Sequence, residues 1–178
     1  MSIPQWYAGQ VITADRLNAR NMMLVEQSAN QDSMDLTFQT SEISVSLESN
    51  AVYAYWCYIS YTAHYTNNFR WRWNTPNATI ASFTQALDTG TNTGQNASRA
   101  SIFRRPAAGT NRVAGGTSDM VAGSPIVVQS AYDSGTLFTS AGNASVTLIF
   151  SKDSNEEADY PSILRGGNQT RFLYQRIG

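Results

Sequence analysis

Alternation of apolar and polar residues dominates most of the chain. In residues 42–48, Ile43, Val45 and Leu47 share one side while serines occupy the other, a pattern that predicts a half-buried β-strand. Turn residues (Gly, Pro, Asn and Asp) separate this segment from other predicted strands, and together they are typical of an antiparallel β-sandwich or jelly roll. The other predicted strands are residues 22–29, 51–65, 68–74, 79–87, 126–131, 136–139, 144–151, 162–165 and 170–176.

The segment 51–65 differs because it is apolar on both faces. Its odd-numbered positions, from Tyr53 to Tyr61, would line the core. A strand that is apolar on both faces is normally covered on both, so the second cover should be a neighbouring subunit or an overlying segment. We expect a homo-oligomer with the following interface residues: Val52, Ala54, Trp56 and Tyr58.

Residues 68–74 alternate aromatic and basic side chains. Trp71 and Trp73 fall on one face, as core residues do, and Arg70 and Arg72 on the other. The same set could form a sugar platform, with aromatic faces stacking on pyranose rings. Arg70 and Arg72 are therefore candidates for recognising a surface receptor, such as a host cell-surface glycan.

Two parts of the chain lack this regular alternation. Residues 88–124 are rich in small and polar residues, which predicts long loops around one or two short strands. Residues 1–21 hold the one helix signal, with Thr13 as N-cap and an end near Asn21. We therefore divide the chain into an arm, residues 1–21, and a β-sandwich domain, residues 22–178. The arm is too short to bury its own large apolar side chains, so these should contact a partner: Trp6, Tyr7, Ile12 and Leu17.

Charge and composition narrow the classes of partner. Only 14% of the 178 residues are charged and the net charge is −1, whereas nucleic-acid binding requires clustered positive charge. No apolar stretch approaches the roughly 18 residues of a membrane span, and the first ten residues do not resemble a secretory signal. We expect a protein made in a cytoplasm that neither binds nucleic acid nor inserts into a membrane.

Residues that could support catalysis or metal binding are few. His64 is the single histidine and Cys57 the single cysteine, and no nucleophile motif accompanies either. In the acidic loop 152–160 the spacing of Asp153, Asn155 and Glu157 matches a calcium loop, but Ala158 replaces the glycine of its sharp turn. We expect no enzyme activity, no cofactor and no metal; a surface-polysaccharide hydrolase with paired carboxylates is a remote alternative.

The arm carries the most specific motif, W-x-x-G-x-x-(I/V)-T-A-x-x-L-N, which runs from Trp6 to Asn18. It resembles the start of small virion proteins of tailed phages that infect actinobacteria. Three further segments are similar to the same family: the strand entry at residues 48–53, the segment NFRWRWNTP at 68–76, where Asn68 replaces an acidic residue, and the ending RFLYQRIG at 171–178. The segment 88–124 matches nothing in that family.

The resemblance implies a jelly-roll-like module, commonly a trimer, that the N-terminal segment attaches to other virion proteins. It implies a virion component assembled in the cytoplasm of the host bacterium. Two positions on the particle stay open: a minor tail or tail-fibre-type protein facing the host surface, which we favour, and a capsid decoration protein on the shell.

Overall fold

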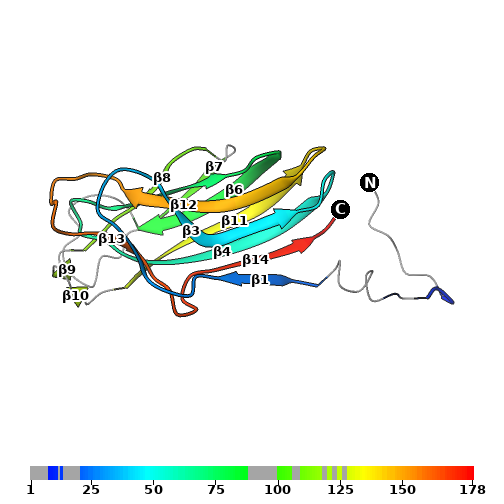
Figure 1. The fold of residues 1–178 in the computed structure, drawn as a ribbon, viewed down its shortest axis with the longest axis horizontal. Coiled ribbons are helices and arrows are strands. Elements are labelled where there is room, and N and C mark those ends of the chain that lie inside the picture. Colours follow the sequence, from blue (N-terminus) through cyan, green and yellow to red (C-terminus); the bar gives the residue numbers. More distant parts are fainter. Residues whose placement is uncertain are drawn as a thin grey trace.

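The computed structural model describes residues 8–11, 13, 21–87, 100–105, 109–117, 120–121, 124–125 and 128–178, and its strands pair in antiparallel sheets. Within these residues there is no α-helix. The helix predicted for residues 13–21 falls mainly on residues 14–20, which lie outside the described residues. The longer strands run along the long axis of the molecule (Figure 1). The strands are β1 (Met23–Glu26), β2 (Gln31–Ser33), β3 (Gln39–Leu47), β4 (Val52–Thr62), β5 (Phe69–Asn74), β6 (Ala78–Leu87), β7 (Ala100–Arg105), β8 (Arg112–Ala114), β9 (Met120–Val121), β10 (Ser124–Pro125), β11 (Gln129–Thr139), β12 (Ala144–Lys152), β13 (Ser162–Leu164) and β14 (Arg171–Arg176).

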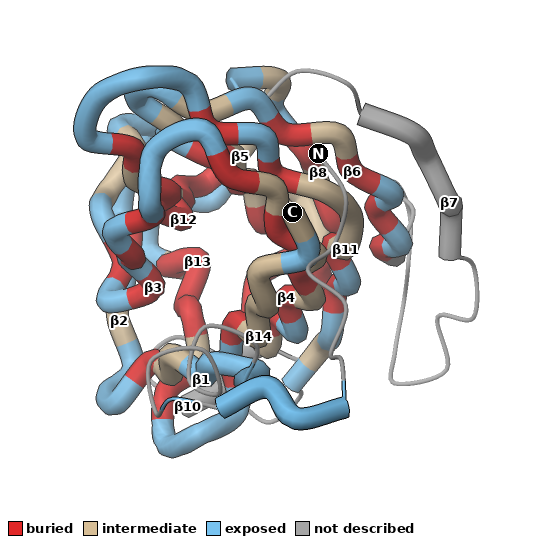
Figure 2. Tube along the Cα trace, turned by 90° about the vertical axis from the view of Figure 1, so that its right-hand side faces the viewer, coloured by how far each residue is buried: buried red, intermediate tan, exposed pale blue. Residues whose placement is uncertain are grey.

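Two of the sheets form the body. The large sheet has the order β1-β14-β4-β11-β6-β7, with β13 paired to β4 and β2 paired to β13. The small sheet has the order β3-β12-β5-β8, and β9 and β10 form a separate pair. Figure 2 shows β3 and β12 on one side and β4, β11 and β6 on the other, with buried positions between them. The arrangement is consistent with a β-sandwich.

The core lies between the two sheets and is rich in aromatic rings. Trp71 and Trp73 of β5 are 0% and 1% exposed, which confirms the prediction that they are core residues. Tyr55 meets the edge of Trp73 at 5.8 Å between ring centroids, and Tyr61 stacks on Phe69 at 4.7 Å. Because these contacts join β4 to β5, they fasten the large sheet to the small one.

Asparagines at positive φ precede four of the strands. Asn50, Asn68, Asn77 and Asn168 have φ between 53° and 66° and stand directly or shortly before β4, β5, β6 and β14. Asparagine tolerates this left-handed conformation better than other residues with a side chain, because its short amide can hydrogen-bond locally. The sharp turns between strands are thus encoded at these positions.

Two predictions of strand position were wrong. Residues 126–131 and 136–139 were predicted as separate strands, yet β11 runs unbroken from Gln129 to Thr139. The segment 88–124 holds β7, β8, β9 and β10, more strands than predicted. In β11, Gly135 fits because its backbone lies close to β6: a Cβ there would stand 2.0 Å from the Ala81 carbonyl oxygen. Gly135 is therefore a requirement of close strand packing.

Candidate functional site

The outer face of the large sheet gathers the predicted interface residues. Along β4 the odd positions from Tyr53 to Tyr61 are buried against the core, and the even positions from Val52 to Ser60 point outward. Tyr58 is 37% exposed. The other three predicted residues, Val52, Ala54 and Trp56, are half-buried. All four lie together on one face, as the alternation predicted.

The neighbouring strands extend this face with further aromatic residues that the sequence analysis did not single out. Across the β4–β11 register, Tyr58 pairs with Tyr132 and Val52 pairs with Phe138. Phe83 of β6 pairs in register with Ser134 of β11, on the side of β11 away from β4. Phe83 is 57% exposed and Phe138 48%. Large exposed rings on a sheet face are unusual, since the outer face of an antiparallel sheet is normally polar.

The centre of this face carries no charge. We define the outer aromatic face as the outward, described positions of β4, β11 and β6, and none of them is Asp, Glu, Lys or Arg. They are Val52, Ala54, Trp56, Tyr58, Ser60, Ser130, Tyr132, Ser134, Thr136, Phe138, Thr79, Ala81, Phe83 and Gln85. Depletion of charge together with enrichment in Tyr, Trp and Phe is the composition of an interface core.

The two tyrosines of this face touch each other. The rings of Tyr58 and Tyr132 meet edge to face, with centroids 4.4 Å apart and planes at 76°. Desolvation, together with the neighbouring Tyr58, raises the pKa of Tyr132 to about 12. The hydroxyl is therefore neutral at physiological pH and adds no charge to the face.

Charged groups begin at the rim, on β14 and β1. The guanidinium carbon of Arg171 lies 6.0 Å from the ring centroid of Tyr58. Arg171 is paired in register with Tyr58 on one side and with Glu26 on the other. The rim thus offers both signs of charge next to the uncharged centre.

The predicted receptor residues lie on the outer face of the small sheet. Arg70 donates from Nε to Ser151 Oγ at 3.0 Å and from a terminal nitrogen to the Leu36 carbonyl oxygen at 2.7 Å. The guanidinium groups of Arg70 and Arg72 stand over the Phe38 ring, at 4.7 and 4.3 Å from its centroid. These contacts hold both arginines against their own chain, and Trp71 and Trp73 lie in the core, where they cannot form a sugar platform with them.

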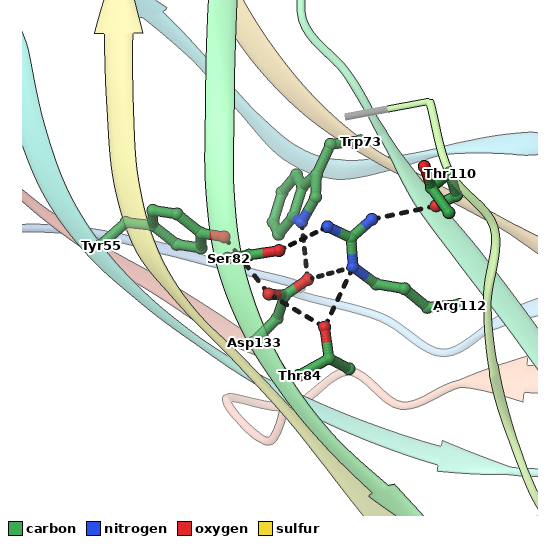
Figure 3. A network of polar contacts seen from close by, with 7 residues as sticks. All are labelled: Tyr55, Trp73, Ser82, Thr84, Thr110, Arg112 and Asp133. Atoms are coloured by element: carbon green, nitrogen blue, oxygen red, sulfur yellow. Dashed lines mark hydrogen bonds and ion pairs between the residues drawn. The ribbon is translucent and has the colours of Figure 1, made fainter. Parts of the chain in front are cut away.

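A polar cluster is buried where β5, β6, β8 and β11 meet (Figure 3). The Asp133 carboxylate forms an ion pair with Arg112, accepts a hydrogen bond from the Trp73 indole at 2.8 Å and accepts another from the Tyr55 hydroxyl at 3.2 Å. Arg112 also donates to Thr84 Oγ1 at 3.1 Å, to Ser82 Oγ at 2.6 Å and to the Thr110 carbonyl oxygen at 3.1 Å. Burial raises the pKa of Asp133, and the Arg112 charge opposes that shift.

This cluster holds the fold together and is closed to substrates. Asp133 and Arg112 are both 0% exposed. Asp133 is buried beside a guanidinium and is therefore not placed to act as one of the paired carboxylates of a hydrolase. Arg112 was missed, because it lies in the segment predicted as loops and nothing in the local sequence indicates its partner.

His64 and Cys57 have the surroundings of packing residues. His64 Nδ1 lies 2.7 Å from Thr66 Oγ1, and its ring stacks on Tyr160 at 4.5 Å. Burial lowers the pKa of His64. Cys57 is 0% exposed, and burial raises the pKa of its thiol, so the unreactive thiol form is favoured.

The acidic loop 152–160 is organised around a lysine. The Lys152 ammonium donates to Asn155 Oδ1 at 2.8 Å and to the carbonyl oxygens of Glu157 and Ala158 at 3.0 and 3.3 Å. Asn67 holds the loop from the other side through its amide, which contacts Glu157 and Tyr160. An internal cation therefore occupies the centre of the loop. Over the part of the chain that the structure describes, no cluster of three or more His, Cys, Asp or Glu residues could hold a metal ion.

Two further expectations concern the arm and membranes. The predicted anchor residues Trp6, Tyr7, Ile12 and Leu17 lie outside the described residues. Within the described residues, no helix has the length and apolar character needed to cross a membrane.

Comparisons with known proteins place the chain in no family. No family model matches it, and no curated protein matches it. Among solved structures it is similar to the infectious bursal disease virus Gx strain structure, with 9% identity over 98% of this chain and 43% of the other, at a TM-score of 0.22. It is also similar to the VP2 subviral particle of the same virus, with 8% identity over 98% of this chain and 44% of the other, at a TM-score of 0.21. The chain thus spans less than half of each, and at such TM-scores neither likeness carries an argument.

Proposed function

We propose that this protein is a non-enzymatic structural component of a tailed-phage virion, attached by residues 1–21 and exposing an oligomeric, jelly-roll-like body. On the particle it acts as a minor tail or tail-fibre-type protein that faces the host surface. The proposal rests on the motif from Trp6 to Asn18 and on the strand order described above.

The strand order is the observation that carries the proposal. In both sheets the neighbours come alternately from the early and the late parts of the chain: β1-β14-β4-β11 in one and β3-β12-β5-β8 in the other. This order results when one long antiparallel hairpin wraps into two sheets, which is the jelly-roll arrangement. The strands β6 and β7 extend the large sheet beyond β11. Jelly rolls are frequent in viral capsid domains and in lectins, and the first of these classes agrees with the arm motif.

The surface chemistry supports assembly over catalysis. The outer aromatic face has the composition of an interface core, while the buried carboxylate Asp133 serves the ion pair with Arg112. The histidine and the cysteine are both packed inside. A protein that works by contact needs a surface that can bind a partner, and the outer aromatic face is the candidate for that surface.

The test is to locate the chain on purified particles of the phage that encodes it. Mass spectrometry of the particles should detect the protein, and gold-labelled antibodies should mark the tail. Particles that lack the protein would overturn the proposal, and labelling confined to the head would replace the tail role with capsid decoration.

A second arm of the test addresses attachment. Trp6→Ala should strongly reduce retention of the protein on particles, since a buried tryptophan is a typical interface anchor. Met34→Ala provides a matched control, because Met34 is 52% exposed and lies in the body. Equal retention of the two variants would show that residues 1–21 are not the anchor.

A further inference from the structure

We infer that the outer aromatic face is the contact surface between copies of this chain, with a second copy as its occupant. The inference deepens the proposed function, because it identifies the surface through which the oligomeric body would assemble. The argument uses the size of the face, its charge and the distribution of its side chains.

The face is large enough for a stable interface. Strands β4 and β11 have 11 residues each. At about 3.3 Å per residue and about 4.8 Å between strands, the three strands of the face cover roughly 35 Å by 14 Å. This flat area of about 500 Å² is a lower bound on the accessible surface, because protruding side chains add to it. The rim strands β14 and β1 extend the face further, toward the ~800 Å² that each partner contributes to an interface of standard size. A glycan chain would contact only a narrow strip of it.

The charge pattern favours a second copy. Two identical surfaces that face each other bring like charges together unless they carry none or arrange them in complementary pairs. The outer aromatic face has no charged residue at its centre, so its own copy meets no repulsion there. At the rim, Glu26 and Arg171 supply both signs, which allows cross-pairing between copies.

The side chains vary in size in a way suited to packing against another surface. Ala54, Thr136 and Ala81 form one row across the strands. Phe138 lies in the row on one side of them, and Trp56 and Phe83 in the row on the other. Rings that flank a row of small side chains can interdigitate with the rings of a second copy.

The arrangement of the two tyrosines argues against a sugar platform at their position. Stacking on a pyranose ring requires an aromatic face lying flat and open to solvent. Tyr58 and Tyr132 instead meet edge to face, at 76°. The guanidinium group of Arg171 also approaches the Tyr58 ring. Protein–protein interface cores commonly contain such tilted aromatic pairs.

The first experiment measures association in solution. Sedimentation equilibrium on the full chain should give an oligomer at micromolar concentration. Tyr132→Glu and Phe138→Glu should each weaken association at least about 30-fold, which is the effect expected at a central aromatic residue of an interface. Met34→Glu, which adds the same charge at an exposed position outside the face, should associate like the original protein.

The second experiment measures protection of the face without adding a charge. Cys57 is buried, so a maleimide reacts chiefly with a cysteine placed on the surface. Ser134→Cys at the centre of the face should be labelled several-fold more slowly at high protein concentration than at low. Ser46→Cys, exposed on β3 of the small sheet, should be labelled at a rate independent of concentration.

The outcomes separate this inference from the proposed function. A monomeric full chain, or an oligomer that both face variants leave intact, overturns the inference. Protection of the Ser134→Cys thiol in a monomer also overturns it, since a segment of the same chain would then cover the face. None of these results bears on whether the protein is found on particles, which tests the proposed function separately.

Discussion

Arg112 Nε lies 2.9 Å from Asp133 Oδ2, in an ion pair that joins β8 to β11 with neither side chain exposed to solvent. Removing one charge from a buried pair leaves the other charge buried without compensation. This lowers the free energy of unfolding far more than the loss of a surface salt bridge does. Asp133 also receives the Trp73 and Tyr55 hydrogen bonds, so the pair fixes the position of large core rings.

Arg112→Met should therefore lower the free energy of unfolding by about 3–5 kcal/mol, because it leaves the Asp133 carboxylate buried without its counter-charge. Urea unfolding monitored by tryptophan fluorescence measures the change. Arg72→Met is the matched control. Arg72 is half-buried and stands over the Phe38 ring, so its loss should cost about 1 kcal/mol or less. Equal effects of the two substitutions would contradict the structural role of the pair.

Lys152→Met should destabilise the loop 152–160, because the carbonyl oxygens of Glu157 and Ala158 would lose their donor inside the protein. A cost of about 1–3 kcal/mol is expected for buried acceptors left unsatisfied. Thermal melting of the variant measures it. The original protein should melt at the same temperature with and without EDTA, and a fall of more than a few degrees in EDTA would reveal a metal ion that stabilises the fold.

His64 should make stability depend on pH. Its folded-state pKa lies below the ordinary value of 6.5 because it is buried, although Glu157 partly opposes the shift. As pH falls below about 6.5 the unfolded chain takes up a proton first, so unfolding becomes easier, with a slope of at most about 1.4 kcal/mol per pH unit from this group. The stability that the buried, neutral His64 contributes is fully present above pH 6.5, and it is lost as the pH falls toward and through the folded-state pKa of His64. In His64→Gln, urea midpoints at pH 7.5 and 5.0 should differ less than in the original protein.

A chain that starts at Met22 should still fold. Among the described residues, the buried hydrophobic residues of the core run from Ile43 to Phe172, so the body supplies an extensive core of its own. We expect a melting temperature within a few degrees of the full chain and greatly reduced retention on particles. A truncated chain that fails to fold would show that the arm is part of the core.

Sequence predicted the half-buried strands best, because burial on one face imposes strict alternation. The predicted strands 42–48 and 68–74 follow that rule, and the apolar positions that they placed on one face are buried in β3 and β5. The strand β11 was predicted in two pieces because Asp133 and Gly135 occupy inward positions where an apolar residue was expected. The reasons for both residues lie in other strands: Arg112 of β8 pairs with the carboxylate, and Ala81 of β6 crowds the glycine.

The candidate interface was predictable only in part. The strand β4 shows it in sequence, since Val52, Ala54, Trp56 and Tyr58 make a second apolar side. On β11 and β6, polar residues separate the outward rings, so Tyr132, Phe138 and Phe83 look like isolated hydrophobic residues until strand pairing brings them beside β4. Pairing of strands distant in sequence creates the face, and local patterns do not encode it.

The single lysine of the 178 residues gives the molecule a built-in reporter. Lys152 is 0% exposed and holds three oxygens of its own loop. An amine-acylating reagent can therefore reach this side chain only while the loop is open. The rate at which Lys152 is acylated under native conditions therefore measures how often the loop opens locally. The measurement needs no inserted label, and no other lysine contributes to the signal.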